Sequence, residues 1–153
     1  MFIDTFFTII SKFHHNRISL YSKNLDFNNL IDIGTHKGEF LESFLKIKKI
    51  KRFYCFEPQK KIYDNLNKKF KRFNKIKLYN YALGDICSNR KIKINNLTST
   101  STLSKFNHNS KYLKFKNFLI SDDLRNQKSY IIKQKTIDRL FEKVSLKKTF
   151  MKI

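Results

Sequence analysis

Short apolar runs alternate with amphipathic stretches from residue 29 onward, and this alternation most constrains how the chain can fold. Three apolar runs have the length and composition of buried strands: 30–33, 52–57 and 75–82. Between them, residues 38–48 and 59–73 place apolar side chains at helical spacing. Because strands that alternate with helices build parallel sheets with helices on their faces, the sequence predicts an α/β fold with a parallel, doubly wound sheet.

The second half of the chain carries a weaker pattern of the same kind. Four further segments are predicted there: a hairpin strand at 90–96, a polar, hydroxyl-rich loop at 97–112, an extended segment at 129–136 and a short helix at 136–143. Thr136 has the side chain of a helix cap. Another apolar run begins at residue 149.

The first 28 residues precede this alternation, and we predict them as a helical extension (1–28) of a domain at 29–153. Apolar side chains share one face of such a helix: Phe2, Phe6, Ile9, Ile10 and Phe13. That face can pack on the domain, pack on a second copy in a homo-oligomer, or lie at a membrane surface. The segment is too short to cross a bilayer, and Asp4 stands where a signal peptide carries positive charge. The sequence therefore predicts a cytoplasmic protein without a transmembrane segment.

The chain of 153 residues has a formal net charge of +21, from 33 Lys and Arg against 12 Asp and Glu. A charge of this size suits a polyanion such as RNA as a partner. The lysines are spread along the whole chain rather than gathered in one segment. This spread favours a solvated basic surface and disfavours a dedicated nucleic-acid interface.

The cysteines and histidines do not show the spacing of metal ligands. Cys55 and Cys87 form no CxxC pair, and the four histidines show neither HxxxH nor HExxH. Cys55 lies inside an apolar run, which indicates a buried, reduced thiol. We therefore predict no metal site.

Two of the three glycines, Gly34 and Gly38, lie in the turn after the first predicted strand. Asp32 lies near the end of that strand. Ligands of parallel α/β sheets bind beyond the carboxyl ends of the strands, where glycine lets a ligand approach the backbone. An ordinary strand-to-helix turn also favours Gly and Asp, so the turn alone leaves both interpretations open. The GxxxG spacing matches neither GxGxxG nor a phosphate loop, which argues against a pyrophosphate site.

The only proline and the third glycine lie at corresponding positions after the next two predicted strands. Glu57 and Pro58 end the second strand, and Gly84 follows the third. Glu57 follows Gly34 at roughly the 20-residue spacing at which such folds place a carboxylate for ribose hydroxyls, although a surface glutamate would also fit there. The carboxyl ends of three neighbouring strands therefore predict one ligand pocket.

Four motifs, "IDIGTHKGEF", "CFEP", "NYALGD" and "KQKTIDRLF", occur in an order and spacing that resemble the FkbM-type branch of the class I S-adenosylmethionine-dependent methyltransferases. The resemblance covers residues 29–153. It implies a Rossmann-like domain with a mostly parallel sheet and flanking helices. Such a domain would bind S-adenosyl-L-methionine and transfer its methyl group to a hydroxyl oxygen. The implied acceptor is a sugar, a polyketide or a similar small molecule or glycan.

The resemblance also implies roles for single residues. The methionine part of the cofactor would be lined by Asp32, Gly34, Thr35 and Gly38, the ribose bound by Glu57, and the adenine flanked by Tyr81 and Ala82. His36 would contact the cofactor or the acceptor, or stabilise the turn. No general base is assigned, although His108 and the hydroxyl groups of residues 97–112 could reach an acceptor.

The resemblance implies that residues 149–153 belong to the fourth core strand, and the segment after them departs from the family. In the family, a similar strand leads into an acidic motif, commonly Asp-x-Glu-Gly, which completes the cofactor pocket and is absent from this sequence. The resemblance therefore implies an incomplete domain, from a truncated reading frame or a protein completed by a second polypeptide. Besides the methyltransferase, two alternatives remain open: a basic polyanion-binding module, and a non-catalytic Rossmann-like fragment or assembly partner.

Overall fold

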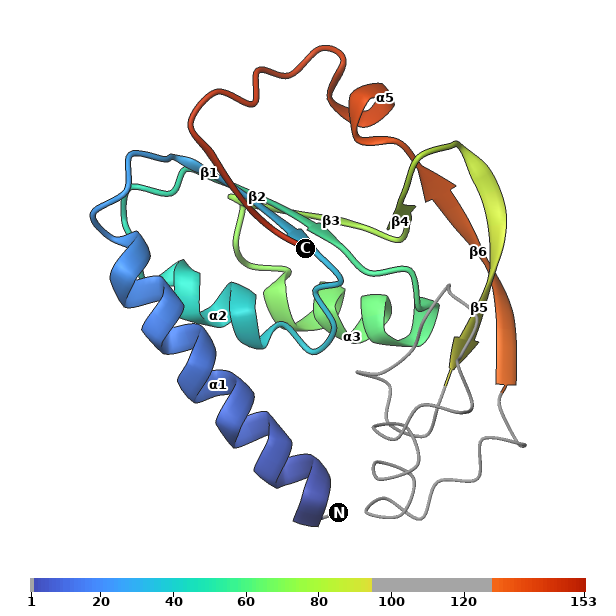
Figure 1. Ribbon diagram of the computed structural model, residues 1–153, viewed down its shortest axis with the longest axis horizontal. Coiled ribbons are helices and arrows are strands. Elements are labelled where there is room, and N and C mark those ends of the chain that lie inside the picture. The colour runs from blue at the N-terminus through green and yellow to red at the C-terminus, as the bar shows by residue number, and fades with distance from the viewer. Residues whose placement is uncertain (1, 95–127) are drawn as a thin grey trace, which may run out of the picture.

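The computed structural model describes residues 2–94 and 128–153, whose strands form two sheets (Figure 1). The first sheet has the order β3-β2-β1-β7, and all of its neighbouring strands run parallel. Its strands are β1 (Asn29–Ile33), β2 (Arg52–Phe56), β3 (Ile76–Tyr79) and β7 (Thr149–Lys152). The predicted parallel α/β sheet is confirmed, and so is the fourth core strand.

The order of the strands places a switch point between β1 and β7. The chain passes outward from β1 to β2 and β3, and β7 then pairs with the opposite side of β1. In open α/β sheets the crevice for ligands lies at such a point, beyond the carboxyl ends of the strands. The turn that follows β1 therefore occupies the place where this fold binds ligands.

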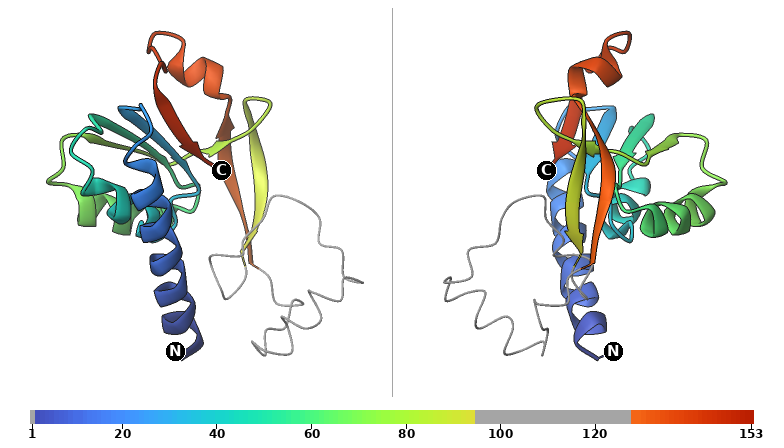
Figure 2. Two further views of the ribbon diagram at one scale, coloured as in Figure 1. Left: turned by 60° about the vertical axis from the view of Figure 1, so that its left-hand side comes forward. Right: turned by 90° about the vertical axis from the view of Figure 1, so that its right-hand side faces the viewer.

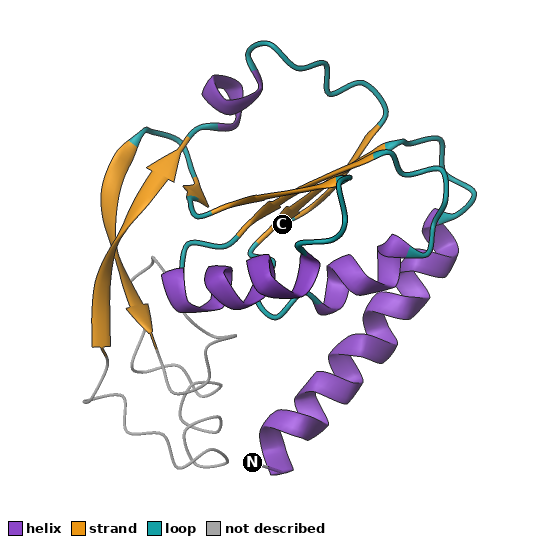
Figure 3. Ribbon diagram, turned by 180° about the vertical axis from the view of Figure 1, so that it is seen from behind, coloured by secondary structure: helices purple, strands orange, loops and turns teal. Residues whose placement is uncertain are grey.

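Three helices lie on one face of the first sheet: α1 (Phe2–Ser22), α2 (Glu39–Leu45) and α3 (Lys60–Phe70) (Figures 1 and 3). Phe44 and Leu66 of these helices join the core cluster of Leu30 and Phe53. The spacing of apolar residues at 38–48 and 59–73 had predicted both α2 and α3.

The opposite face is covered by α5 (Ile137–Phe141), which lies above the sheet in Figure 1. Phe141 packs there against Tyr54 and Phe56 of β2. The predicted cap is present, because the Thr136 hydroxyl accepts a hydrogen bond from the Arg139 backbone N–H at 3.3 Å. Both faces of the sheet are thus covered, as expected for a parallel sheet.

A second sheet contains β4 (Ala82–Leu83), β5 (Ser88–Ile94) and β6 (Lys128–Lys135) in the order β4-β6-β5. The predicted strand at 75–82 is not continuous, since β3 and β4 belong to different sheets. Asn80 lies between them, and its side-chain amide donates to the carbonyls of Glu57 at 2.9 Å and Pro58 at 3.0 Å. These bonds hold the chain at the end of β3, where it turns toward the second sheet.

The strands predicted at 90–96 and 129–136 correspond to β5 and β6, which pair antiparallel. The segment at 97–112, with His108, lies outside the described residues. The same is true of the side chains of Phe2 and Phe6.

The amino-terminal helix α1 covers Phe2–Ser22 of the predicted extension at 1–28, and its first half extends away from the sheet (Figure 2). Its second half packs against α2, where the His15 ring lies 5.3 Å from the Phe40 ring. Ile9, Ile10 and Phe13 are exposed. Of the three alternatives for this face, packing of these side chains on the domain is therefore contradicted, while packing on a second copy and contact with a membrane surface stay predictions. In the described part of the chain, no helix has both the length and the apolar character that crossing a bilayer requires.

Candidate functional site

The turn between β1 and α2, residues 34–38, has a backbone that is fixed by its neighbours. Gly34, His36 and Gly38 have positive φ angles of 74°, 51° and 86°. The backbone N–H groups of Gly34 and Thr35 both donate to the carbonyl of Phe56, at 2.9 and 3.0 Å. The turn is therefore tied directly to the end of β2.

The two glycines of this turn are required for different reasons. A Cβ on Gly38 would lie 2.8 Å from Cε2 of Phe70 and 3.1 Å from Cδ2 of Leu66, so this glycine lets the turn pack closely on α3. A Cβ on Gly34 would meet no atom within 4 Å. Both residues adopt a backbone conformation that favours glycine. Of the two, Gly34 leaves open space beside the backbone, where a ligand can approach.

Glu57 joins the glycine turn to the turn that follows β2. Its Oε2 accepts a hydrogen bond from the His36 backbone N–H at 3.0 Å, and its Oε1 accepts one from the Gln59 backbone N–H at 2.8 Å. Only 3% of the residue is exposed. Burial raises the pKa of the Glu57 carboxyl, although both hydrogen bonds act in the opposite direction. The predicted ribose-binding carboxylate is thus held rigidly beside the turn.

His36 contributes mainly its backbone to this arrangement, and its side chain lies beside α2. Its Nδ1 is 3.8 Å from Oε2 of Glu39, the first residue of that helix. Burial acts to raise the pKa of Glu39, but the hydrogen bond to His36, a backbone hydrogen bond and the charges of His36 and Lys37 together outweigh it, so the pKa is lower than usual. An acidic residue at this helix start makes it a poor place for an anionic ligand group.

Asp32 and Thr35 lie beneath the turn and not on its open side. Asp32 has no exposed surface, and the Thr35 hydroxyl donates to the Asp32 carbonyl at 3.1 Å. The carboxylate of Asp32 is paired with Lys152, whose Nζ lies 3.1 Å from Oδ1. Both predicted residues therefore support the turn from inside.

Lys152 was missed by reasoning from the sequence. The available signal was the strand order: once β7 is placed next to β1 in parallel register, Lys152 lies opposite Asp32. Because the two residues are far apart in the chain, only this pairing brings them together.

Tyr81 and Ala82 lie at the junction of the two sheets. The ring of Tyr81 stacks on Tyr79 at 6.4 Å, and Nζ of Lys135 lies 4.0 Å above it. Ala82 is buried in a small core with Ile92. Gly84 follows β4 and packs on β6, since its N–H donates to the carbonyl of Lys135 at 3.1 Å and a Cβ there would clash with the side chain of Gln134. The six other predicted site residues gather at the glycine turn.

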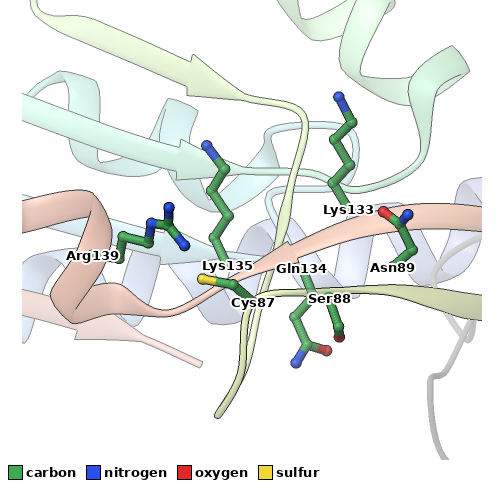
Figure 4. A pocket seen from close by; sticks show the side chains of 7 residues that line it. All are labelled: Cys87, Ser88, Asn89, Lys133, Gln134, Lys135 and Arg139. Atoms are coloured by element: carbon green, nitrogen blue, oxygen red, sulfur yellow. The ribbon is translucent and has the colours of Figure 1, made fainter.

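A pocket of about 330 Å³ opens on β5 and β6. None of the predicted site residues lines it. It is lined by Cys87, Ser88, Asn89, Lys133, Gln134, Lys135 and Arg139 (Figure 4). Hydrogen bonding to the Thr136 backbone and to Arg139 lowers the pKa of the exposed Cys87 thiol. Three cationic side chains make this pocket suitable for an anion.

No protein-family model and no curated protein matches the sequence. Among solved structures, the chain is similar to methyltransferase FkbM from Methylobacillus flagellatus KT, with 15% sequence identity and a TM-score of 0.48. The similarity covers 84% of this chain and 26% of that one, so the chain spans about a quarter of that protein's length.

Proposed function

We propose that the protein is an S-adenosylmethionine-dependent methyltransferase that acts on a hydroxyl group of a small molecule or glycan in the cytoplasm. One observation carries the proposal: at the switch point, the open backbone of Gly34 lies next to a Glu57 carboxylate that two backbone N–H groups hold in place. The identity of the ligand is supported by the four motifs that resemble the FkbM type.

Glu57 is the residue that would bind the ribose. Each carboxylate oxygen accepts one backbone hydrogen bond and has a second lone pair left for a ribose hydroxyl. Gly34 would let the methionine part approach the backbone, and Tyr81 would offer its ring to the adenine. Asp32 and Thr35 would act from beneath the turn, because their side chains are buried.

When bound, S-adenosylmethionine supplies an electrophilic methyl group on its sulfonium. The protein has to hold the acceptor oxygen close to this carbon and in line with the bond that breaks. A general base would assist by taking the hydroxyl proton. The proposal assigns no residue to that role.

Binding of S-adenosylhomocysteine, measured by isothermal titration calorimetry, tests the proposal. Replacing Glu57 by Ala removes hydrogen bonds to a charged group, so we expect a loss of about 1.5–3 kcal/mol, or roughly 10- to 150-fold in affinity. Glu142→Ala is the matched control, because Glu142 is exposed on the carboxyl side of α5. Absence of binding by the wild-type protein, or equal losses in both variants, would contradict the proposal and favour a non-catalytic fragment.

The basic pocket on β5 and β6 favours a second candidate, the binding of a polyanion such as RNA. Lys133, Lys135 and Arg139 line this pocket. If they contact phosphates, affinity for single-stranded RNA should fall with salt, and Lys133→Ala should reduce the slope by about one. RNA binding that does not depend on salt would exclude this function.

A further inference from the structure

Lys152, the last residue of β7, places its ammonium group beside three oxygen atoms. Its Nζ lies 3.1 Å from Oδ1 of Asp32, and it donates to the carbonyls of Ile33 and Gly34, both at 3.0 Å. An ammonium group has three N–H donors. Two of these donors bond to the carbonyls, and the Asp32 carboxylate is held as an ion pair. All three oxygen atoms belong to the end of β1 and the glycine turn.

Burial makes this contact important for Asp32. The Asp32 side chain is 0% exposed, whereas that of Lys152 is 29% exposed. Neither Oδ1 nor Oδ2 of Asp32 has a hydrogen-bond partner among the described residues, and its contact with Lys152 is an ion pair. An isolated buried carboxylate is strongly unfavourable, so the nearby ammonium offsets much of the cost of this one.

The two carbonyl contacts act on the turn itself. Donation to the carbonyls of Ile33 and Gly34 fixes the orientation of two successive peptide groups. The second of these peptides carries the Thr35 N–H, which donates to Phe56 at 3.0 Å. Lys152 therefore holds the carbonyl side of these peptide groups, while Phe56 of β2 holds the N–H side.

We propose that Lys152 is a positioning residue of the proposed cofactor site, which holds the Gly34 turn in its ligand-binding conformation through the carbonyls of Ile33 and Gly34. This inference rests on the proposed function of the same turn. It differs from a simpler role in which Lys152 only neutralises Asp32. The two roles predict different behaviour when both members of the ion pair are replaced.

The test compares Lys152→Met with the double variant Asp32→Asn, Lys152→Met. The single variant leaves a buried carboxylate unpaired, so we expect a lower Tm and a loss of about 10-fold or more in affinity for S-adenosylhomocysteine. The double variant removes the buried charge. We expect it to recover most of the Tm but not the affinity, because the turn carbonyls still lack their donor.

Lys148→Met is the matched control. Lys148 lies just before β7, and its Nζ is 2.7 Å from Oδ2 of Asp26 in an exposed ion pair. Exposed pairs contribute little to stability, and this one does not contact the turn. We therefore expect the wild-type Tm and affinity. Wild-type affinity in the double variant, or in Lys152→Met, would overturn the positioning role.

Amide hydrogen exchange separates this inference from the proposed function, because it needs no ligand. The Thr35 amide should be protected in the wild type and in Lys148→Met, and should exchange faster in Lys152→Met and in the double variant. If the wild type does not bind S-adenosylhomocysteine but shows this exchange pattern, the proposed function fails and the positioning of the turn stands. Unchanged protection of Thr35 in the double variant would overturn the positioning.

Discussion

Gly34 and Gly38 have similar backbone angles but different surroundings, which gives a prediction at the scale of single residues. Gly34→Ala adds only the cost of a left-handed conformation, about 1–2 kcal/mol, since open space surrounds its Cβ. Gly38→Ala adds the same cost and also crowds Phe70 and Leu66, which typically costs a further 1–3 kcal/mol or so.

Urea denaturation of the two variants measures this difference as the free energy of unfolding. We expect Gly38→Ala to be the less stable of the two by about 1–3 kcal/mol. The affinity for S-adenosylhomocysteine should follow the opposite order. When both variants are folded, Gly34→Ala should bind more weakly than Gly38→Ala, because only the Cβ at Gly34 enters the open side of the turn. Equal stability would show that Gly38 does not serve close packing.

The pKa of Glu57 predicts how its contribution to stability depends on pH. Burial raises this pKa above the ordinary value of 4.5, so the folded protein binds the proton more tightly than the unfolded chain does. The contribution of Glu57 to the free energy of unfolding therefore falls as pH rises from about 4.5 through the raised pKa, and is constant above it.

Glu57→Gln removes the titrating group and is the reference for this measurement. The stability of the wild type relative to this variant should decrease with increasing pH, when both are denatured in urea at a series of pH values. A relative stability that increases with pH would mean that the folded pKa is lowered instead.

At the scale of elements, the helix α5 depends on one aromatic side chain. Phe141 is 7% exposed, and its ring meets the Tyr54 ring edge-on at 4.8 Å. Phe141→Ala should lower the free energy of unfolding by about 3–5 kcal/mol. Phe13→Ala is the matched substitution in α1, where the side chain is 73% exposed, and it should change stability by less than about 0.5 kcal/mol. Similar losses in thermal or chemical denaturation would contradict this account of both helices.

The sequence predicted elements where local periodicity and burial agree. Residues 30–33 and 52–57 are apolar because β1 and β2 are buried on both faces, and the spacing at 59–73 matches the buried side of α3. The split of residues 75–82 was not predictable from periodicity. It depends on Asn80, whose contacts with Glu57 and Pro58 exist only after the sheet has formed.

At the scale of the whole molecule, pairing between distant segments determined what the sequence could not predict. The glycine turn and Glu57 were found from their positions after strands, a rule that needs no knowledge of pairing partners. Lys152 joins Asp32 only through the parallel register of β7 with β1. The basic pocket likewise needs the antiparallel pairing of β5 with β6. The local pattern therefore predicted the glycine turn and Glu57, whereas the contact of Lys152 with this turn depends on the strand order.

The central claim is that the turn at the switch point binds the cofactor, and an amide NMR titration with S-adenosylhomocysteine tests it most directly. We predict that the largest chemical-shift changes occur at the backbone amides of Gly34, Thr35, His36 and Gln59. These amides belong to the glycine turn or bond to Glu57. Shift changes confined to Lys133, Lys135 and Arg139, or no changes at a large excess of ligand, would contradict the claim.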